Sequence, residues 1–137
     1  AHQRFPGDQA RREQDAVCWA RGLVFIYPIW WFGPPAILKG WIDRVFTRKF
    51  AFDFDANGMK GLLTHEKALI LNTLGGDEAS YRQNRWHELL IRPMAEGILG
   101  TCGINNVLHR AFYRVPTVTQ TERQIMLEEA RALATAF

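Results

Sequence analysis

An apolar segment that runs directly into three aromatic residues and then into an amphipathic helix is the feature that most limits the fold of this chain. Residues 23–27 are apolar without alternation, which is typical of a parallel strand covered by helices on both faces. Gly33 would let the chain turn sharply, and Pro35 suits the first position of the helix that follows. Because open α/β sheets bind ligands at the carboxyl ends of their strands, residues 30–32 are expected to lie beside a flat ligand.

The three aromatic residues are Trp30, Trp31 and Phe32. As single residues, large apolar side chains such as these would more often belong to a core. Three in succession cannot all face one interior, since side chains along an extended segment alternate in direction. At least one should be exposed, and the run as a whole favours a binding function.

The rest of the chain alternates helices and strands, which indicates an α/β fold with a doubly wound parallel sheet and helices on both faces. Residues 53–64 contain Asp, Asn and Gly in close succession and are expected to form an exposed loop. The expected helices cover residues 8–20, 35–46, 85–99 and a stretch after residue 119, and the expected strands cover residues 23–27, 68–71 and 107–115, the last as an edge strand.

Apolar residues at helical spacing support the second and third of these helices. Ile37 in the second helix and Leu89 in the third are among the residues expected to face inward. Pro93 is expected to kink the third helix because it lacks a backbone N–H. Thr119 and Glu122 can form a capping box for the last helix.

A second motif follows the strand expected at residues 68–71. It contains Thr73, Gly75, Gly76, Tyr81 and His87 in the pattern T-x-G-G-x(4)-Y-x(5)-H. A glycine pair that ends a strand is common, and a lone tyrosine or helical histidine would usually be a surface or structural residue. Glycines also allow a ligand to approach the backbone closely, and tyrosine and histidine can donate hydrogen bonds or move protons.

Together, residues 28–52 and 73–87 resemble the flavin-binding segments of the NAD(P)H:quinone oxidoreductases, a family that includes DT-diaphorase-like and modulator of drug activity B-like proteins. The resemblance implies a flavodoxin-like fold in a single domain, residues 1–137, which carries FMN or FAD as cofactor. It also implies transfer of a hydride from NAD(P)H through the flavin to a quinone in one shared site. The resemblance is poor before residue 23, where the family has two further strands and a phosphate-binding loop, so we expect the chain to be incomplete at its N-terminus.

The resemblance also implies roles for particular residues. Tyr81 and His87 would act as catalytic residues near N1 and O2 of the flavin. Phe52 and Phe54 correspond to positions where family members can carry tyrosines that close the pocket of the partner subunit, which implies a homodimer, although phenylalanine lacks the hydroxyl. The residues expected to bind the flavin are Pro28, Ile29, Trp30, Trp31, Phe32, Thr73, Leu74, Gly75 and Gly76.

Composition argues against several other classes of protein. The net charge of +3 arises from 17 basic and 14 acidic residues without a basic cluster, so a nucleic-acid partner is not expected. No apolar run is long enough for a membrane span, so we expect a cytoplasmic protein without membrane insertion. Cys18 and Cys102 are expected to be buried or half-buried thiols in a reducing compartment rather than a disulfide, and His2, His65 and His109 to be surface or edge residues without a metal.

Two other functions remain open at this point. Some relatives of this family are ancillary subunits of glutathione-gated potassium efflux systems, and such a protein could use the same flavin pocket as a binding module with a transporter as partner. An electron carrier that binds no nucleotide substrate is a weaker alternative, since such proteins are usually more acidic and lack the pair Tyr81 and His87. The choice between FMN and FAD, and between NADH and NADPH, stays open.

Overall fold

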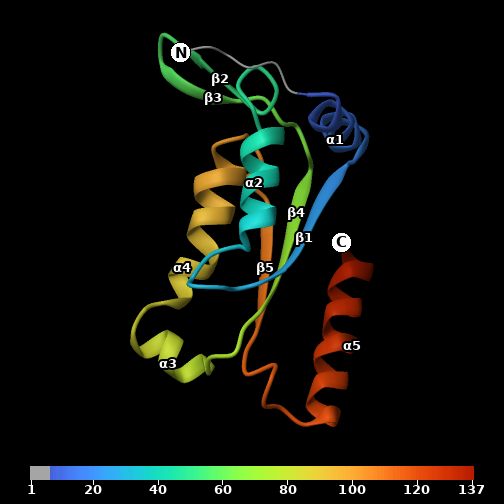
Figure 1. Cartoon of the computed structure of the whole chain (residues 1–137), viewed down its shortest axis with the longest axis vertical. Coiled ribbons are helices and arrows are strands. Elements are labelled where there is room, and N and C mark those ends of the chain that lie inside the picture. Colours follow the sequence, from blue (N-terminus) through green and yellow to red (C-terminus); the bar gives the residue numbers. More distant parts are fainter. Residues whose placement is uncertain (1–6) are drawn as a thin grey trace.

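The computed structural model describes residues 7–137 and contains a three-stranded parallel sheet with the strand order β1-β4-β5 (Figure 1). The strands of this sheet are β1 (Gly22–Pro28), β4 (Lys67–Thr73) and β5 (Val107–Phe112). The helices are α1 (Asp8–Trp19), α2 (Ala36–Val45), α3 (Glu78–Gln83), α4 (His87–Arg92), η1 (Pro93–Gly100) and α5 (Gln120–Ala136). The predicted flavodoxin-like α/β architecture is confirmed, with strands that agree with the expected ones to within a few residues.

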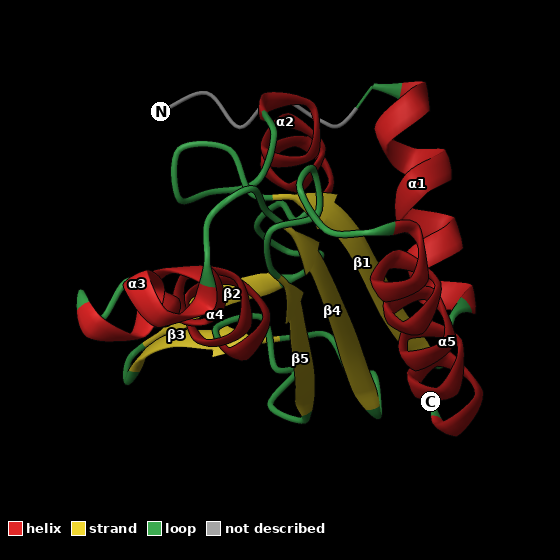
Figure 2. Cartoon of the chain, turned by 90° about the horizontal axis from the view of Figure 1, so that it is seen from below, coloured by secondary structure: helices red, strands yellow, loops and turns green. Residues whose placement is uncertain are grey.

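Helices cover both faces of the sheet. Buried residues of α1, α2 and η1 form one cluster with Leu23, Phe25 and Ile70. On the other face, α5 packs against Leu69 and Leu71 of the central strand. Figure 2 shows α4 and α5 on opposite sides of the sheet. This is the doubly wound arrangement expected for an alternating α/β chain.

The expectation that β1 is covered on both faces is wrong. Leu23, Phe25 and Tyr27 are buried, but Val24 is 47% and Ile26 70% exposed. The reason is that β1 is an edge strand in this sheet, and α5 packs on β4 and β5 instead. An apolar run predicts the strand but does not show which of its two faces is covered by a helix.

The expected loop at residues 53–64 is also wrong in part, because it contains an antiparallel hairpin. Strand β2 (Phe52–Asp55) pairs with β3 (Gly58–Gly61), and Asp55 lies opposite Gly58. Asp55 accepts a hydrogen bond from the Asn57 N–H at 2.7 Å, and Gly58 has a φ of 115° that favours glycine. The Asp-x-Asn-Gly sequence is therefore the tip of a hairpin rather than a longer loop.

The single helix expected at residues 85–99 consists of α4 followed by η1, a π-helix that begins at Pro93. Proline has no N–H to donate, and the wider turns start where that bond is missing. Leu89 is 45% exposed and does not face inward as expected. The capping box of α5 is confirmed, since Thr119 Oγ1 accepts from the Glu122 N–H at 3.2 Å and the Glu122 carboxylate accepts from the Thr119 N–H at 2.7 Å.

Within residues 7–137, no helix combines the length and apolar character needed to cross a membrane.

Candidate functional site

The carboxyl ends of β1 and β4 bring the two sequence motifs together. Pro28 lies opposite Thr73 in the parallel ladder, and the Ile29 N–H donates to the Thr73 carbonyl oxygen at 2.8 Å. Beyond the ladder, the Leu74 N–H donates to the Phe112 oxygen at 3.0 Å. The loop after β1, residues 28–33, and the loop after β4, residues 73–76, are therefore neighbours at one edge of the sheet.

The aromatic residues after β1 form a tight turn. The backbone groups of Trp30 and Gly33 exchange hydrogen bonds of 3.0 and 3.1 Å. Between them, Trp31 has a φ of 47° and Phe32 a φ of 63°, so both adopt the left-handed conformation. We expected Gly33 to supply the conformational freedom, but the positive φ values fall on two bulky residues, at a cost of about 1–2 kcal/mol each. Such strain is most often found at functional sites.

The turn presents its rings outward, as expected for a run of three aromatic residues. Trp31 is 96% exposed, Trp30 is 63% exposed and Phe32 is 37% exposed. Phe32 is held by neighbours from the second motif, with its ring centroid 6.1 Å from that of Tyr81 and 5.3 Å from that of Trp86. The turn and the segment after β4 thus form one aromatic surface.

Tyr81 lies at the centre of this aromatic surface. Its ring centroid is 5.7 Å from those of both Trp86 and Tyr113, in edge-to-face geometry. Sequence reasoning missed Trp86 and Tyr113. Trp86 immediately precedes a predicted site residue and could have been found, but Tyr113 follows β5 and is brought to Tyr81 only by the sheet.

The glycine pair has two distinct environments. A Cβ atom on Gly76 would lie 2.5 Å from the Tyr81 ring, whereas a Cβ on Gly75 would meet nothing closer than 3.9 Å. Gly76 is therefore required for Tyr81 to lie over the loop. Among residues 7–137, neither glycine N–H donates to a backbone carbonyl group, so both remain available as donors at this edge.

The polar groups of Tyr81 and His87 are suited to a ligand. Burial raises the pKa of the Tyr81 phenol, which keeps its proton available for donation at neutral pH. His87 begins α4, and its Nδ1 atom is buried without a hydrogen-bond partner among the described residues. Buried polar atoms are usually paired, so an orphaned imidazole nitrogen fits a site that is completed by a bound group.

The structure does not bring Phe52 and Phe54 into this site within one chain. Both lie in the hairpin of β2 and β3, at the opposite end of the molecule from α3 (Figure 1). Phe52 packs against the main core, while Phe54 is 50% exposed, with the Arg48 guanidinium 5.7 Å from its ring centroid. The intervening Asp53 is paired with Lys49 and Arg48, which lower the pKa of its carboxyl group.

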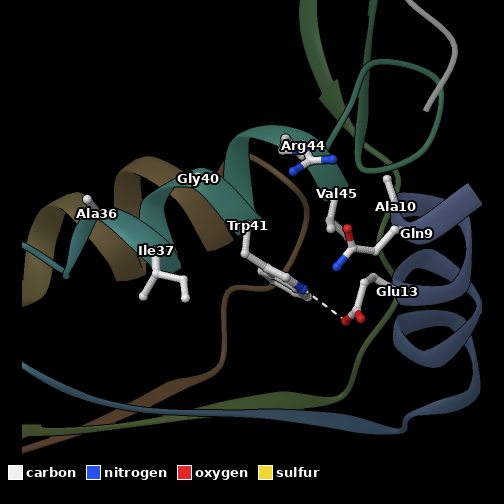
Figure 3. Close-up of a pocket in the computed structure, with 9 residues that line it drawn as sticks. All are labelled: Gln9, Ala10, Glu13, Ala36, Ile37, Gly40, Trp41, Arg44 and Val45. Atoms are coloured by element: carbon white, nitrogen blue, oxygen red, sulfur yellow. Dashed lines mark hydrogen bonds between the residues drawn. The ribbon is translucent and has the colours of Figure 1, made fainter. Parts of the chain in front are cut away.

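A hollow of about 420 Å³ lies between α1 and α2, away from the two loops (Figure 3). At its wall, the Trp41 indole N–H donates to the Glu13 carboxylate at 2.9 Å. Ile37, which we expected to face inward, is 86% exposed beside this hollow. Six of the nine residues around it belong to α2, within the first motif, but none lies in the loops at residues 28–33 and 73–76, so the hollow is a second feature of the surface rather than part of the candidate site.

The remaining predicted residues are placed as follows. Both cysteines are free thiols, and Cys102 is buried as expected, but Cys18 is exposed because it lies on the outer side of α1, and the expectation that it is buried or half-buried is wrong. His65 contacts the Val17 carbonyl oxygen at 2.8 Å. His109 does lie on the edge strand β5, but its half-buried side chain bonds to Asn72, which the sequence did not suggest. His2 lies outside the described residues.

These features define an α/β protein with a strained aromatic turn and a glycine loop at the carboxyl edge of a parallel sheet. The chain belongs to the flavodoxin-like fold family, whose sequence profile matches residues 1–135.

Among the similar proteins, an uncharacterized NAD(P)H oxidoreductase of Haemophilus influenzae is 30% identical over 123 residues, which cover 90% of this chain and 61% of that protein. NAD(P)H dehydrogenase [quinone] 1 of Cavia porcellus is 42% identical over 94 residues, which cover 66% of this chain and 34% of that protein. The chain spans about half the length of the curated relatives it matches.

Two solved structures resemble this one closely. The protein Smu.1420 from Streptococcus mutans UA159 is 30% identical, with a TM-score of 0.87 over 96% of this chain and 68% of that chain. The NAD(P)H:quinone oxidoreductase from Methanothermobacter marburgensis is 29% identical, with a TM-score of 0.83 over 93% of this chain and 64% of that chain. The resemblance to the quinone oxidoreductase family that the two motifs indicate is thereby confirmed.

Proposed function

We propose that the full-length protein is a flavin-dependent NAD(P)H:quinone oxidoreductase. The observation that carries this proposal is the meeting of the aromatic turn and the glycine loop around Tyr81. Trp86 packs on the same ring, and the residue that follows it, His87, has a buried nitrogen without a partner among the described residues. The names of two curated relatives, an NAD(P)H dehydrogenase and a ribosyldihydronicotinamide dehydrogenase that both act on quinone, support quinone reduction. A bound flavin would supply the redox chemistry, since it can accept a hydride from NAD(P)H and deliver two electrons to a quinone.

The protein's own residues would bind and orient the reactants. Residues 28–32 would pack along the flat ring system, with the two exposed tryptophans at its border. The Gly75 and Gly76 N–H groups would face the polar edge of the ring, while Thr73 and Leu74, whose backbone groups bond to Ile29 and Phe112, would hold the loop beside it. Preorganised backbone donors of this kind stabilise negative charge as it develops.

Tyr81 and His87 would complete the polar side of the site. The protonated phenol can donate a hydrogen bond to developing negative charge, because burial raises its pKa. The Nδ1 atom of His87 can hold or release a proton there. The ancillary subunit of a potassium efflux system is not favoured, since the curated relatives reported above are named as an NAD(P)H oxidoreductase and an NAD(P)H dehydrogenase.

The proposed activity can be tested on the full-length protein. We expect it to bind FMN or FAD with micromolar affinity or better, and to oxidise NADH or NADPH only when a quinone such as menadione is present. Flavin fluorescence and nicotinamide absorbance report the two steps. A protein that binds neither flavin at tens of micromolar, or that binds flavin but is not reduced by either nicotinamide, would contradict the proposal.

We further propose that the protein is a cytoplasmic homodimer in which Phe54 of one subunit lies over the site of the other. Phe54 is half exposed on a hairpin that is remote from the site of its own chain, and exposed aromatic side chains of this kind are common at interfaces. Two-fold symmetry would then produce two equivalent sites. Both cysteines are free, in keeping with a reducing compartment.

Changing Phe54 to serine is expected to raise the dimer dissociation constant about tenfold, the loss typical of one buried aromatic contact, and to raise the KM for quinone in the same variant. Phe52 is unsuitable for this test because it packs against the core. Leu127→Ser on α5, which also removes an exposed apolar side chain, is the control and should change neither quantity. Sedimentation velocity and steady-state kinetics measure the two effects, and a wild-type protein that is monomeric at tens of micromolar would exclude the dimer.

A further inference from the structure

Asn72 is a fully buried polar side chain in the central strand of the sheet, with an exposed fraction of 0%. It occupies the position immediately before Thr73, where the glycine loop of the candidate site begins. A buried amide destabilises the folded state unless both its donor and its acceptor are paired. The partners of this amide therefore matter for the position of the loop.

The amide is bonded to both neighbouring strands. Its Nδ2 donates to the Tyr27 carbonyl oxygen at 3.4 Å, and its Oδ1 lies 2.7 Å from His109 Nε2. Tyr27 is on β1 and His109 on β5, so a single side chain links all three strands.

The donor and acceptor roles follow from chemistry. A carbonyl oxygen can only accept, so Nδ2 must face Tyr27 and Oδ1 must face the imidazole. His109 therefore carries a proton on Nε2 and donates it to the amide. Burial, assisted by the charge of Arg110, lowers the pKa of His109, so the ring is neutral with one fixed tautomer.

The linked residues adjoin both site loops. Tyr27 immediately precedes Pro28, and Asn72 immediately precedes Thr73. One step further, the Ile29 N–H donates to the Thr73 oxygen at 2.8 Å, which is the direct bond between the two loops. A change in the orientation of the Asn72 amide would shift the strand ends on which this bond depends.

We propose that His109 is a positioning residue, which by fixing the orientation of the Asn72 amide sets the separation of the loops at residues 28–33 and 73–76. It acts on the site through Asn72 and touches no reactant. Its effect on ligand binding rests on the proposed function, namely that a flavin ring lies between these loops. Its effect on the hydrogen bond between the two loops does not rest on the proposed function.

A purely structural role would be served as well by apolar side chains. Replacing both partners of a buried hydrogen bond by apolar groups of similar size is often nearly neutral for stability, whereas removing one partner leaves the other unsatisfied. Only the polar pair supplies a directional bond that defines where the strand ends lie. Stability and positioning can therefore be separated by comparing single and double variants.

The test uses His109→Leu, His109→Gln and the double variant Asn72→Leu/His109→Leu in the full-length protein. Hydrogen exchange of the Ile29 amide, measured by NMR without ligand, reports the bond between the loops. The Ala68 amide is the internal control. Its N–H donates to the Asn106 carbonyl oxygen at 2.9 Å, at the opposite end of β4 from Asn72. Titration with FMN and with FAD reports the affinity of the site, and urea unfolding reports stability.

In His109→Leu we expect the Ile29 amide proton to exchange at least tenfold faster relative to that of Ala68. The flavin dissociation constant should rise about tenfold, because the variant leaves one buried polar group, the Asn72 Oδ1, without a partner. In His109→Gln, whose side-chain amide can donate from a similar position, Ile29 exchange and flavin affinity should both stay close to those of the wild type. The double variant should regain wild-type stability but neither Ile29 protection nor affinity.

Wild-type protection of Ile29 in His109→Leu would overturn the proposal. So would a double variant in which protection returns together with stability, since His109 would then only support the fold. If His109→Leu does not fold, the double variant and His109→Gln still decide between these outcomes. If the wild-type protein binds no flavin, the proposed function fails, while the exchange data still test the positioning role.

Discussion

Replacing Gly76 by alanine is expected to weaken flavin binding by about tenfold or more, and the same replacement at Gly75 is expected to weaken it less. A Cβ on Gly76 would lie 2.5 Å from the Tyr81 ring and force the ring off the loop, while a Cβ on Gly75 would meet only the Pro116 ring, at an ordinary contact distance of 3.9 Å. Neither glycine has a positive φ, so the two substitutions differ in the space available rather than in backbone strain.

The measurement is a flavin titration of both variants in the full-length protein, with the unfolding free energy determined in parallel. Because the Tyr81 ring is partly exposed and can move, we expect Gly76→Ala to cost no more than about 1–2 kcal/mol of stability. Equal affinities in the two alanine variants would show that the placement of Tyr81 does not determine flavin binding.

Changing Tyr81 to phenylalanine, or His87 to alanine, is expected to slow reduction of bound flavin by NAD(P)H by about tenfold or more. The phenylalanine keeps the ring contacts with Phe32 and Trp86 and removes only the hydroxyl donor. His87→Ala removes the nitrogen that is buried without a partner. Stopped-flow absorbance of the flavin measures the rate in each case.

Two further variants make this experiment specific. Tyr113→Phe removes a hydroxyl from the same aromatic group and should reduce flavin at close to the wild-type rate. His87→Asn keeps a polar atom near the position of Nδ1 but cannot exchange a proton in the same way, so it separates hydrogen bonding from proton transfer. Wild-type rates in both Tyr81→Phe and His87→Ala would mean that these residues are structural.

The main elements of the fold could be predicted because each depends on local sequence. Continuous apolar runs predicted β1 and β4, helical spacing predicted α2, and the capping box predicted the start of α5. The hairpin of β2 and β3 was missed, because its strands have four residues each and its turn residues also suit a loop. The inward orientation of Ile37 and Leu89 was wrong, since periodicity indicates an apolar face but does not show that another element covers it.

For the candidate site, the sequence identified the two loops and the order in which they occur, because aromatic, glycine and polar residues must be close in the chain to form them. It could not show that Tyr113 reaches Tyr81, since these residues meet only through the register of β4 and β5. It also could not reveal the partners of Asn72, which come from the strands on either side.

The sequence alone therefore determined the three strands of the parallel sheet and the two motifs, which are local patterns of residues, and the resemblance of those motifs to a known family indicated the flavodoxin-like class. The tertiary structure alone decided that Trp31 and Phe32, and not Gly33, adopt the left-handed conformation. It also decided that Val24 and Ile26 are exposed and that His109 is bonded to a buried amide. These outcomes depend on which distant segments come into contact, and the free energy of such contacts outweighs the preference of any single residue.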